Sequence, residues 1–223
     1  EVVPKPPGAD RVLQRAGPQA FERRIAAARK GTAATAQTKY RFSGNAQQNA
    51  DLFPDRAERV SIMDAFARYR GIGSARINRA LRAGTPDADT AIARMDAAFA
   101  RSPLDQDVVV YRGARGLEFG PQDSWPDDLT GREWTDLAYT STSADPAKAR
   151  PFASDGVMFR ILAPKGTPGV GIRPAARIEA RESEILLGRG QRFRVVHDYG
   201  STPPPRLSAV AEVEARANVR RFA

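Results

Sequence analysis

The chain has 223 residues, of which 41% are hydrophobic and 27% are charged, a balance typical of a folded globular protein. It contains no cysteine, which excludes disulfides, thiolate metal sites and cysteine nucleophiles, and its one histidine, His197, excludes histidine-rich metal sites. The net charge is +9, and most of the positive charges are arginines scattered along the chain. This charge is compatible with a polyanionic partner. Any catalysis must therefore rest on carboxylates, hydroxyls, arginines or a cofactor.

The N-terminal region is predicted to be an extension. Residues 1–10 carry three prolines and a glycine, which favour an extended linker. Residues 21–30 can form a short helix ended by Gly31, and residues 32–49 are small and polar enough for a loop. The chain begins without methionine or a signal segment, so we expect a processed or truncated product. No stretch approaches the roughly 20 apolar residues of a membrane span, and no membrane partner is expected.

Three helices are expected next, because apolar residues recur there at helical spacing. Pro54 is a favoured first helical residue, and glycines 71 and 73 would end the first helix. Ser74 can cap the second helix, and Asp87 or Asp89 can start the third. The residues at helical spacing are Val60, Ile62, Met63, Phe66, Ala67 and Tyr69 in the first helix; Ile77, Ala80 and Leu81 share one face of the second, and Ile92, Met95, Ala98 and Phe99 form the expected buried stripe of the third.

After Pro103 the pattern changes to strand signals. Strands are expected at residues 108–111, 139–143, 157–162, 185–187, 193–196 and 207–213, with a short helix at 146–152 and a turn at 164–166. Glycines 188 and 190 predict a hairpin between the fourth and fifth of these strands. Helices followed by strands indicate an α+β fold. We therefore expect an extension over 1–50 and one domain over 51–223, with a helical lobe (54–102) and a β core (106–215).

Three polar features stand beside these strands. Glu182 and Glu184 are two residues apart, so in a strand they would share one face, either as a solvated surface or as a site that uses a carboxylate. Arg112 ends a strand before Gly113, where it could clamp an anion or simply face solvent. Ser141 lies in a Ser-Thr-Ser run whose hydroxyls could orient a neighbouring carboxylate or serve only the strand.

The order of these features is more specific than any one of them. The chain presents Tyr-Arg-Gly at 111–113, Tyr-Thr-Ser-Thr-Ser at 139–143 and Glu-Ser-Glu-Ile-Leu-Leu at 182–187. It thereby resembles the Arg-Ser-Glu class of arginine-specific mono-ADP-ribosyltransferases. The helical segment 69–82 is similar to the Tyr…Ile-Asn…Leu-Arg segment of iota-type bacterial toxins, and 163–167 is similar to the family's Pro-Lys-Gly turn. The resemblance covers residues 55–215 and implies helices packed on a mixed, mainly antiparallel, two-sheet β core.

The resemblance implies NAD as a co-substrate, with no metal. Arg112 would bind its phosphates, and the main chain of Gly113 would hold the nicotinamide carboxamide. Phe152 would pack on the nicotinamide, although a core phenylalanine on a short helix is the alternative. Tyr69 and Asn78, in the toxin-like helical segment, would complete the cofactor-binding residues.

The resemblance also assigns the catalytic groups. Ser141 would orient Glu184, with Thr142 and Ser143 supporting the strand and the cofactor site. Glu184 would bond the ribose and stabilise the positive charge that develops as nicotinamide leaves. Glu182 would hold the acceptor, because Glu-x-Glu in this family accompanies arginine as the modified side chain. The expected partner is a protein of a host or competitor cell that carries an acceptor arginine.

Two departures from the family pattern leave the core triad intact but motivate an alternative interpretation. Ser74 stands where a second aromatic is usual, and Glu179 stands where an aromatic usually faces the target. A degenerate protein that keeps the fold and binds NAD or a host partner without efficient turnover is therefore the alternative. A nucleic-acid-binding protein is not favoured, since no binding motif accompanies the basic residues. By resemblance we expect a monomeric, secreted bacterial toxin or effector that acts in the target-cell cytoplasm.

Overall fold

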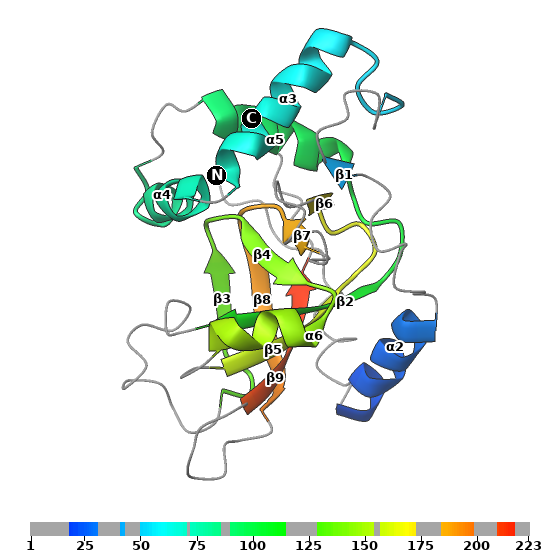
Figure 1. Cartoon of the computed structure of the whole chain (residues 1–223). Helices are drawn as coiled ribbons and strands as arrows, with labels where there is room; N and C mark the ends of the chain where they lie inside the picture. Colours follow the sequence, from blue (N-terminus) through cyan, green and yellow to red (C-terminus); the bar gives the residue numbers. More distant parts are fainter. Residues whose placement is uncertain are drawn as a thin grey trace, which may run out of the picture.

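The computed structural model describes residues 18–30, 41–42, 50–70, 72–85, 90–114, 129–153, 157–172, 184–198 and 209–216. Three helices lie together as a lobe above the strands in Figure 1, and a further helix lies lower, beside the sheet. The helices are α2 (Pro18–Lys30), α3 (Arg56–Tyr69), α4 (Ile72–Arg82), α5 (Thr90–Arg101), α6 (Pro146–Ala149) and the 3-10 helix η2 (Arg150–Ala153). The strands are β1 (Arg41–Phe42), β2 (Val108–Ala114), β3 (Glu133–Asp136), β4 (Thr140–Ser143), β5 (Val157–Ala163), β6 (Gly169–Ile172), β7 (Glu184–Leu187), β8 (Gln191–Asp198) and β9 (Ala209–Arg216).

The described strands follow the order β1-β6-β7-β4-β2-β5-β9-β8-β3. The pairs β1–β6 and β5–β9 are parallel, and the others are antiparallel. At β2–β4 the ladder narrows to one residue pair, Tyr111 with Ser143. That narrow junction divides the strands into a four-stranded and a five-stranded half, which agrees with the expected mixed, mainly antiparallel two-sheet core.

The helical lobe packs on the four-stranded half. Asp55 caps α3 by accepting a hydrogen bond from the backbone N–H of Glu58 at 2.8 Å. The first helix therefore begins two residues after Pro54, the start expected from sequence. The second helix begins at Ile72, so Ser74 lies inside its first turn and does not cap it. The buried cluster contains Phe53, Ile62, Phe66, Tyr69, Ile77, Leu81, Met95, Phe99, Tyr139, Val170 and Leu186 among its members.

Two further clusters fill the β core. Inside the five-stranded half, Trp134 stacks on Phe193 with ring centroids 4.9 Å apart, beside Phe159. On the other face, Phe21 and Ile25 of α2 pack against side chains of β2, β5 and the α6–η2 segment. Figure 1 shows α2 as the blue helix beside the sheet. Burial of these side chains against the sheet stabilises α2, which lies N-terminal to the expected domain boundary.

The sequence interpretation was wrong about the hairpin. Strand β7 pairs with β4 and β6, whereas β8 pairs with β3 and β9, so the turn at 188–190 crosses from one half of the core to the other. Gly190 does take the positive φ, 72°, that a tight turn favours. The short strands β1, β3 and β6 were not expected, and β1 lies in a segment interpreted as a loop.

Candidate active site

Three adjacent strands bring the sequence motifs together. In the ladder, Tyr111 of β2 faces Ser143 of β4, and Ser143 in turn faces Glu184 of β7. Arg112 follows Tyr111 directly, and Ser141 lies two residues before Ser143 on the same strand. The narrow junction between the two halves of the core therefore gathers the basic, hydroxyl and carboxylate residues of all three motifs.

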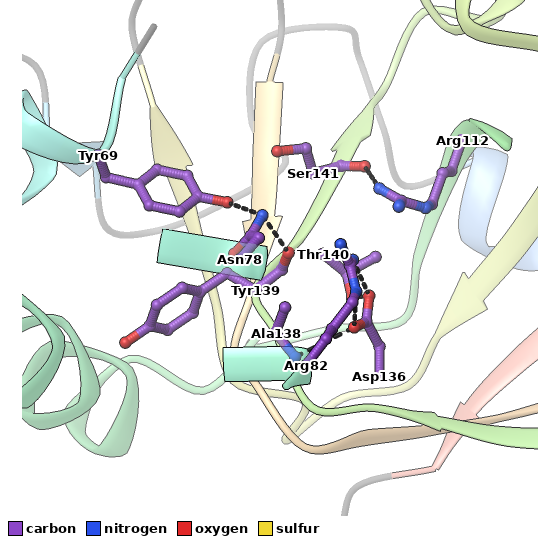
Figure 2. Close-up of polar contacts among 9 residues, drawn as sticks. All are labelled: Tyr69, Asn78, Arg82, Arg112, Asp136, Ala138, Tyr139, Thr140 and Ser141. Carbon is purple, nitrogen blue, oxygen red and sulfur yellow. Dashed lines mark hydrogen bonds and ion pairs between the residues drawn. The ribbon is translucent and has the colours of Figure 1, made fainter. Parts of the chain in front are cut away.

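Arg112 is half-buried and its guanidinium points to β4. Its Nη1 donates a hydrogen bond to the main-chain oxygen of Ser141 at 3.0 Å, as Figure 2 shows. This contact holds the guanidinium beside the β4 motif. There it can bind an anionic ligand through two parallel hydrogen bonds.

Gly113 is required for close packing. A Cβ built on this residue would lie 2.5 Å from the carbonyl oxygen of Ala149, 2.5 Å from the backbone nitrogen of Ala153 and 2.6 Å from the carbonyl carbon of Phe152. The α6–η2 segment can therefore rest directly on β2 only because residue 113 has no side chain. Phe152 is 64% exposed in this segment, so the alternative of a core phenylalanine is wrong.

Tyr69 and Asn78 reach the junction from the helical lobe. Asn78 Nδ2 donates to the Tyr69 hydroxyl at 2.8 Å and to the main-chain oxygen of Tyr139 at 3.3 Å, as drawn in Figure 2. Burial raises the pKa of Tyr69 to about 12, against the opposing effect of hydrogen bonds with Asn78 and Ser141. Glu184 raises that pKa further and Arg112 lowers it, so both charges lie within electrostatic reach of this neutral hydroxyl.

The other hydroxyls of the β4 motif serve the backbone. Thr142 Oγ1 donates to the main-chain oxygen of Ile185 at 2.6 Å, which ties β4 to the strand that begins with Glu184. Ser143 Oγ accepts from the backbone N–H of Asp145 at 3.1 Å, where α6 starts. The supporting role expected for both residues in the cofactor site stays a prediction.

Glu184 is half-buried at the first position of β7. Its expected hydrogen bond with Ser141 stays a prediction. Glu182 and Glu179 lie outside the described residues. Within the described ranges, His, Asp and Glu side chains form no group of three that could hold a metal ion.

One partly buried charge pair was missed by the sequence analysis. Arg82 donates from Nε and Nη2 to the two oxygens of Asp136, at 3.0 and 2.9 Å. The Asp136 carboxylate also accepts from the backbone N–H of Ala138 and the hydroxyl of Thr140. These contacts hold the segment that leads into β4 close to Arg82 at the end of α4, as Figure 2 shows. The Leu-Arg end of the helical motif could have suggested Arg82, but no pattern marks its partner.

Comparison with known proteins assigns this arrangement to a family. Residues 55–215 match the model of the ADP-ribosyltransferase exoenzyme family. Exoenzyme T of Pseudomonas aeruginosa is 32% identical over 159 residues, which cover 70% of this chain and 33% of Exoenzyme T. The chain thus spans about one third of the length of that relative.

In the described part of the chain, no helix is long and apolar enough to cross a bilayer.

Solved structures agree with this assignment. Exoenzyme S from Pseudomonas aeruginosa, in complex with human 14-3-3 protein beta and bound to carba-NAD, is 25% identical, with a TM-score of 0.56 over 94% of this chain and 90% of that one. The enzymatic component C2-I of the C2-toxin from Clostridium botulinum is 19% identical, with a TM-score of 0.57 over 70% of this chain and 44% of its own, and shows the shared fold. The helical lobe, the mainly antiparallel core and the match over residues 55–215 together identify the chain as a member of the ADP-ribosyltransferase exoenzyme family.

Proposed function

We propose that this protein transfers ADP-ribose from NAD to an arginine side chain of a target protein and releases nicotinamide. The observation that carries the proposal is the meeting of Arg112, Ser141 and Glu184 on β2, β4 and β7, faced by Tyr69 and Asn78 from the lobe. Family membership and the carba-NAD bound to Exoenzyme S support NAD as the co-substrate.

The residues present fit such a dinucleotide. Asn78 Oδ1 is a buried acceptor without a hydrogen-bond partner among the described residues, which suits an amide or amino donor of a ligand. The Arg112 guanidinium suits a pyrophosphate. Exposed Phe152, beside Gly113, offers an aromatic face for the nicotinamide ring.

The chemistry follows from the charges. As the bond between nicotinamide and ribose breaks, positive charge develops on the sugar, and the Glu184 carboxylate stabilises it while accepting a hydrogen bond from the ribose. Ser141 and the neutral Tyr69 hydroxyl keep the polar edge of the site hydrogen-bonded. Glu182 then holds the acceptor guanidinium and assists its loss of a proton, because a protonated guanidinium cannot attack.

The two glutamates give the sharpest test. Glu184→Gln should reduce both NAD hydrolysis and label transfer to lysate proteins by about 100-fold or more. Glu182→Gln should abolish transfer and retain hydrolysis, and the labelled product should be sensitive to hydroxylamine. Glu133→Gln, on β3, is the matched control and should retain both activities. Equal losses in the two site variants would contradict the division of roles.

The degenerate interpretation makes a different prediction. A protein that binds without turnover would show no NAD hydrolysis at high protein concentration, although calorimetry would still detect binding. Because Exoenzyme S was solved with human 14-3-3 protein beta, the assay should be run with and without that protein. Inactivity under both conditions would refute the enzymatic proposal.

The setting proposed for this activity is that of a secreted bacterial toxin or effector. The exoenzymes that the chain resembles support this setting. The protein would act as a monomer in the cytoplasm of the target cell, on a protein of that cell. Mass spectrometry of lysate treated with the protein and NAD would identify the modified residue and its protein.

A further inference from the structure

A charge cluster lies outside the proposed active site, at the turn between β7 and β8. Arg189 in this turn meets Asp96 of α5, with Nε 3.0 and 2.9 Å from the two carboxylate oxygens and Nη2 2.7 Å from Oδ2. The two residues are 93 positions apart in the sequence. The forked contact therefore fastens the turn that follows the Glu184 strand to the helical lobe.

The same carboxylate holds a second element. The Tyr139 hydroxyl donates to Asp96 Oδ1 at 2.7 Å and also lies 3.2 Å from the main-chain oxygen of Ile92. Tyr139 is fully buried, and its ring stacks on Phe99 with centroids 5.4 Å apart. Burial and the neighbouring Asp96 raise the pKa of Tyr139 far above its ordinary value, so the hydroxyl remains a donor at any physiological pH.

Tyr139 connects this cluster to the site. It directly precedes β4, which carries Ser141, and its main-chain oxygen accepts from Asn78. Its ring also meets the Tyr69 ring edge-on, with centroids 5.5 Å apart. Tyr139 thus contacts Tyr69 through its ring and Asn78 through its main-chain oxygen, and it directly precedes the strand that carries Ser141.

We propose that Asp96 and Arg189 are positioning residues, which set the separation between the lobe (Tyr69 and Asn78) and the strands that carry Ser141 and Glu184. The inference rests on the proposed function for its kinetic consequence. Neither residue touches the reacting groups. Since Asp96 binds the β7–β8 turn and the residue before β4 at once, loss of Arg189 removes the charged contact between the turn and the lobe and leaves the carboxylate without its cation.

The experiment compares Arg189→Met, which keeps a long side chain and removes the guanidinium, with Arg192→Met. Arg192 makes a similar, half-exposed ion pair with Glu133, within the five-stranded half and away from the lobe. Arg189→Met should raise the KM for NAD about tenfold, with kcat within about twofold of the unaltered protein. Arg189→Lys should recover part of this loss, because it restores the charge without the fork.

Melting temperature and hydrogen exchange are measured on the same variants. Both methionine variants should melt at similar temperatures, whereas only Arg189→Met should exchange faster at the amides of residues 140–143 and 184–187. Equal KM values and equal exchange in the two variants would overturn the inference. If the unaltered protein neither binds nor hydrolyses NAD, the proposed function fails; the exchange comparison alone then decides the positioning role.

Discussion

The contact between Gly113 and η2 permits a quantitative test of how the site is built. Alanine at this position would place its Cβ 2.5 to 2.6 Å from three backbone atoms of the α6–η2 segment, whereas real Cβ contacts essentially never fall below 3.0 Å. The segment must therefore retreat by about 0.5 Å or more. Overpacking of this kind costs roughly 1 to 3 kcal/mol of folding free energy. Because Phe152 lies in the displaced segment, we expect weaker binding of NAD as well as lower stability.

A matched control separates these two effects. Gly166 has a φ of 89° and nothing within 4 Å of a built Cβ, so Gly166→Ala introduces backbone strain of about 1 to 2 kcal/mol without a clash. Urea unfolding should show similar losses of stability for Gly113→Ala and Gly166→Ala. Nicotinamide release at varied NAD should show a KM raised about fivefold or more in Gly113→Ala alone. An unchanged KM in that variant, or the same rise in both, would refute the reasoning.

Two further predictions concern stability. Ile25→Ala removes a buried side chain of α2 that packs on the sheet, and it should lower the free energy of unfolding by about 2 to 5 kcal/mol. Urea unfolding measures this change. A loss below about 1 kcal/mol would show that α2 does not belong to the folded unit. The buried Tyr69 holds its proton to about pH 12, whereas an unfolded tyrosine ionises near pH 10.0, so Tyr69 alone should lower the free energy of unfolding by about 1.4 kcal/mol per pH unit between these values, in addition to the same effect from Tyr139. Tyr69→Phe should reduce this alkaline slope, and an identical slope in the variant would contradict the proposed burial.

The sequence predicted those parts of the fold that are determined locally. In α3 and α5, apolar residues recur at helical spacing, and β2 contains a continuous apolar run. The sequence therefore predicted that these elements exist and whether each is a helix or a strand. The predicted ends differ from the observed ends by only a few residues. The missed strands β1 and β3 are two and four residues long, and each is held by a partner far away in the chain, β6 and β8 respectively. Nothing within such short segments distinguishes them from a loop.

The hairpin error has a related cause. Glycines at 188 and 190 signal a change of direction, but they do not specify which strands become neighbours. The partner of Arg189 is Asp96, 93 residues earlier, and no local pattern joins the two. For the same reason the motifs identified Arg112, Ser141 and Glu184 as a group, whereas the charge pairs that support these residues became visible only in the folded chain.

The place of β9 has a consequence for the order in which the chain can fold. This strand is formed by residues 209–216, yet it lies between β5 and β8 rather than at an edge. Until it is synthesised, no strand ladder among the described residues joins β8 and β3 to β2 and β5, and β5 and β8 each present an unpaired edge. A nascent or shortened chain that lacks these residues would therefore expose surfaces prone to pairing with other chains. The five-stranded half can therefore be completed only after residues 209–216 have been added to the chain.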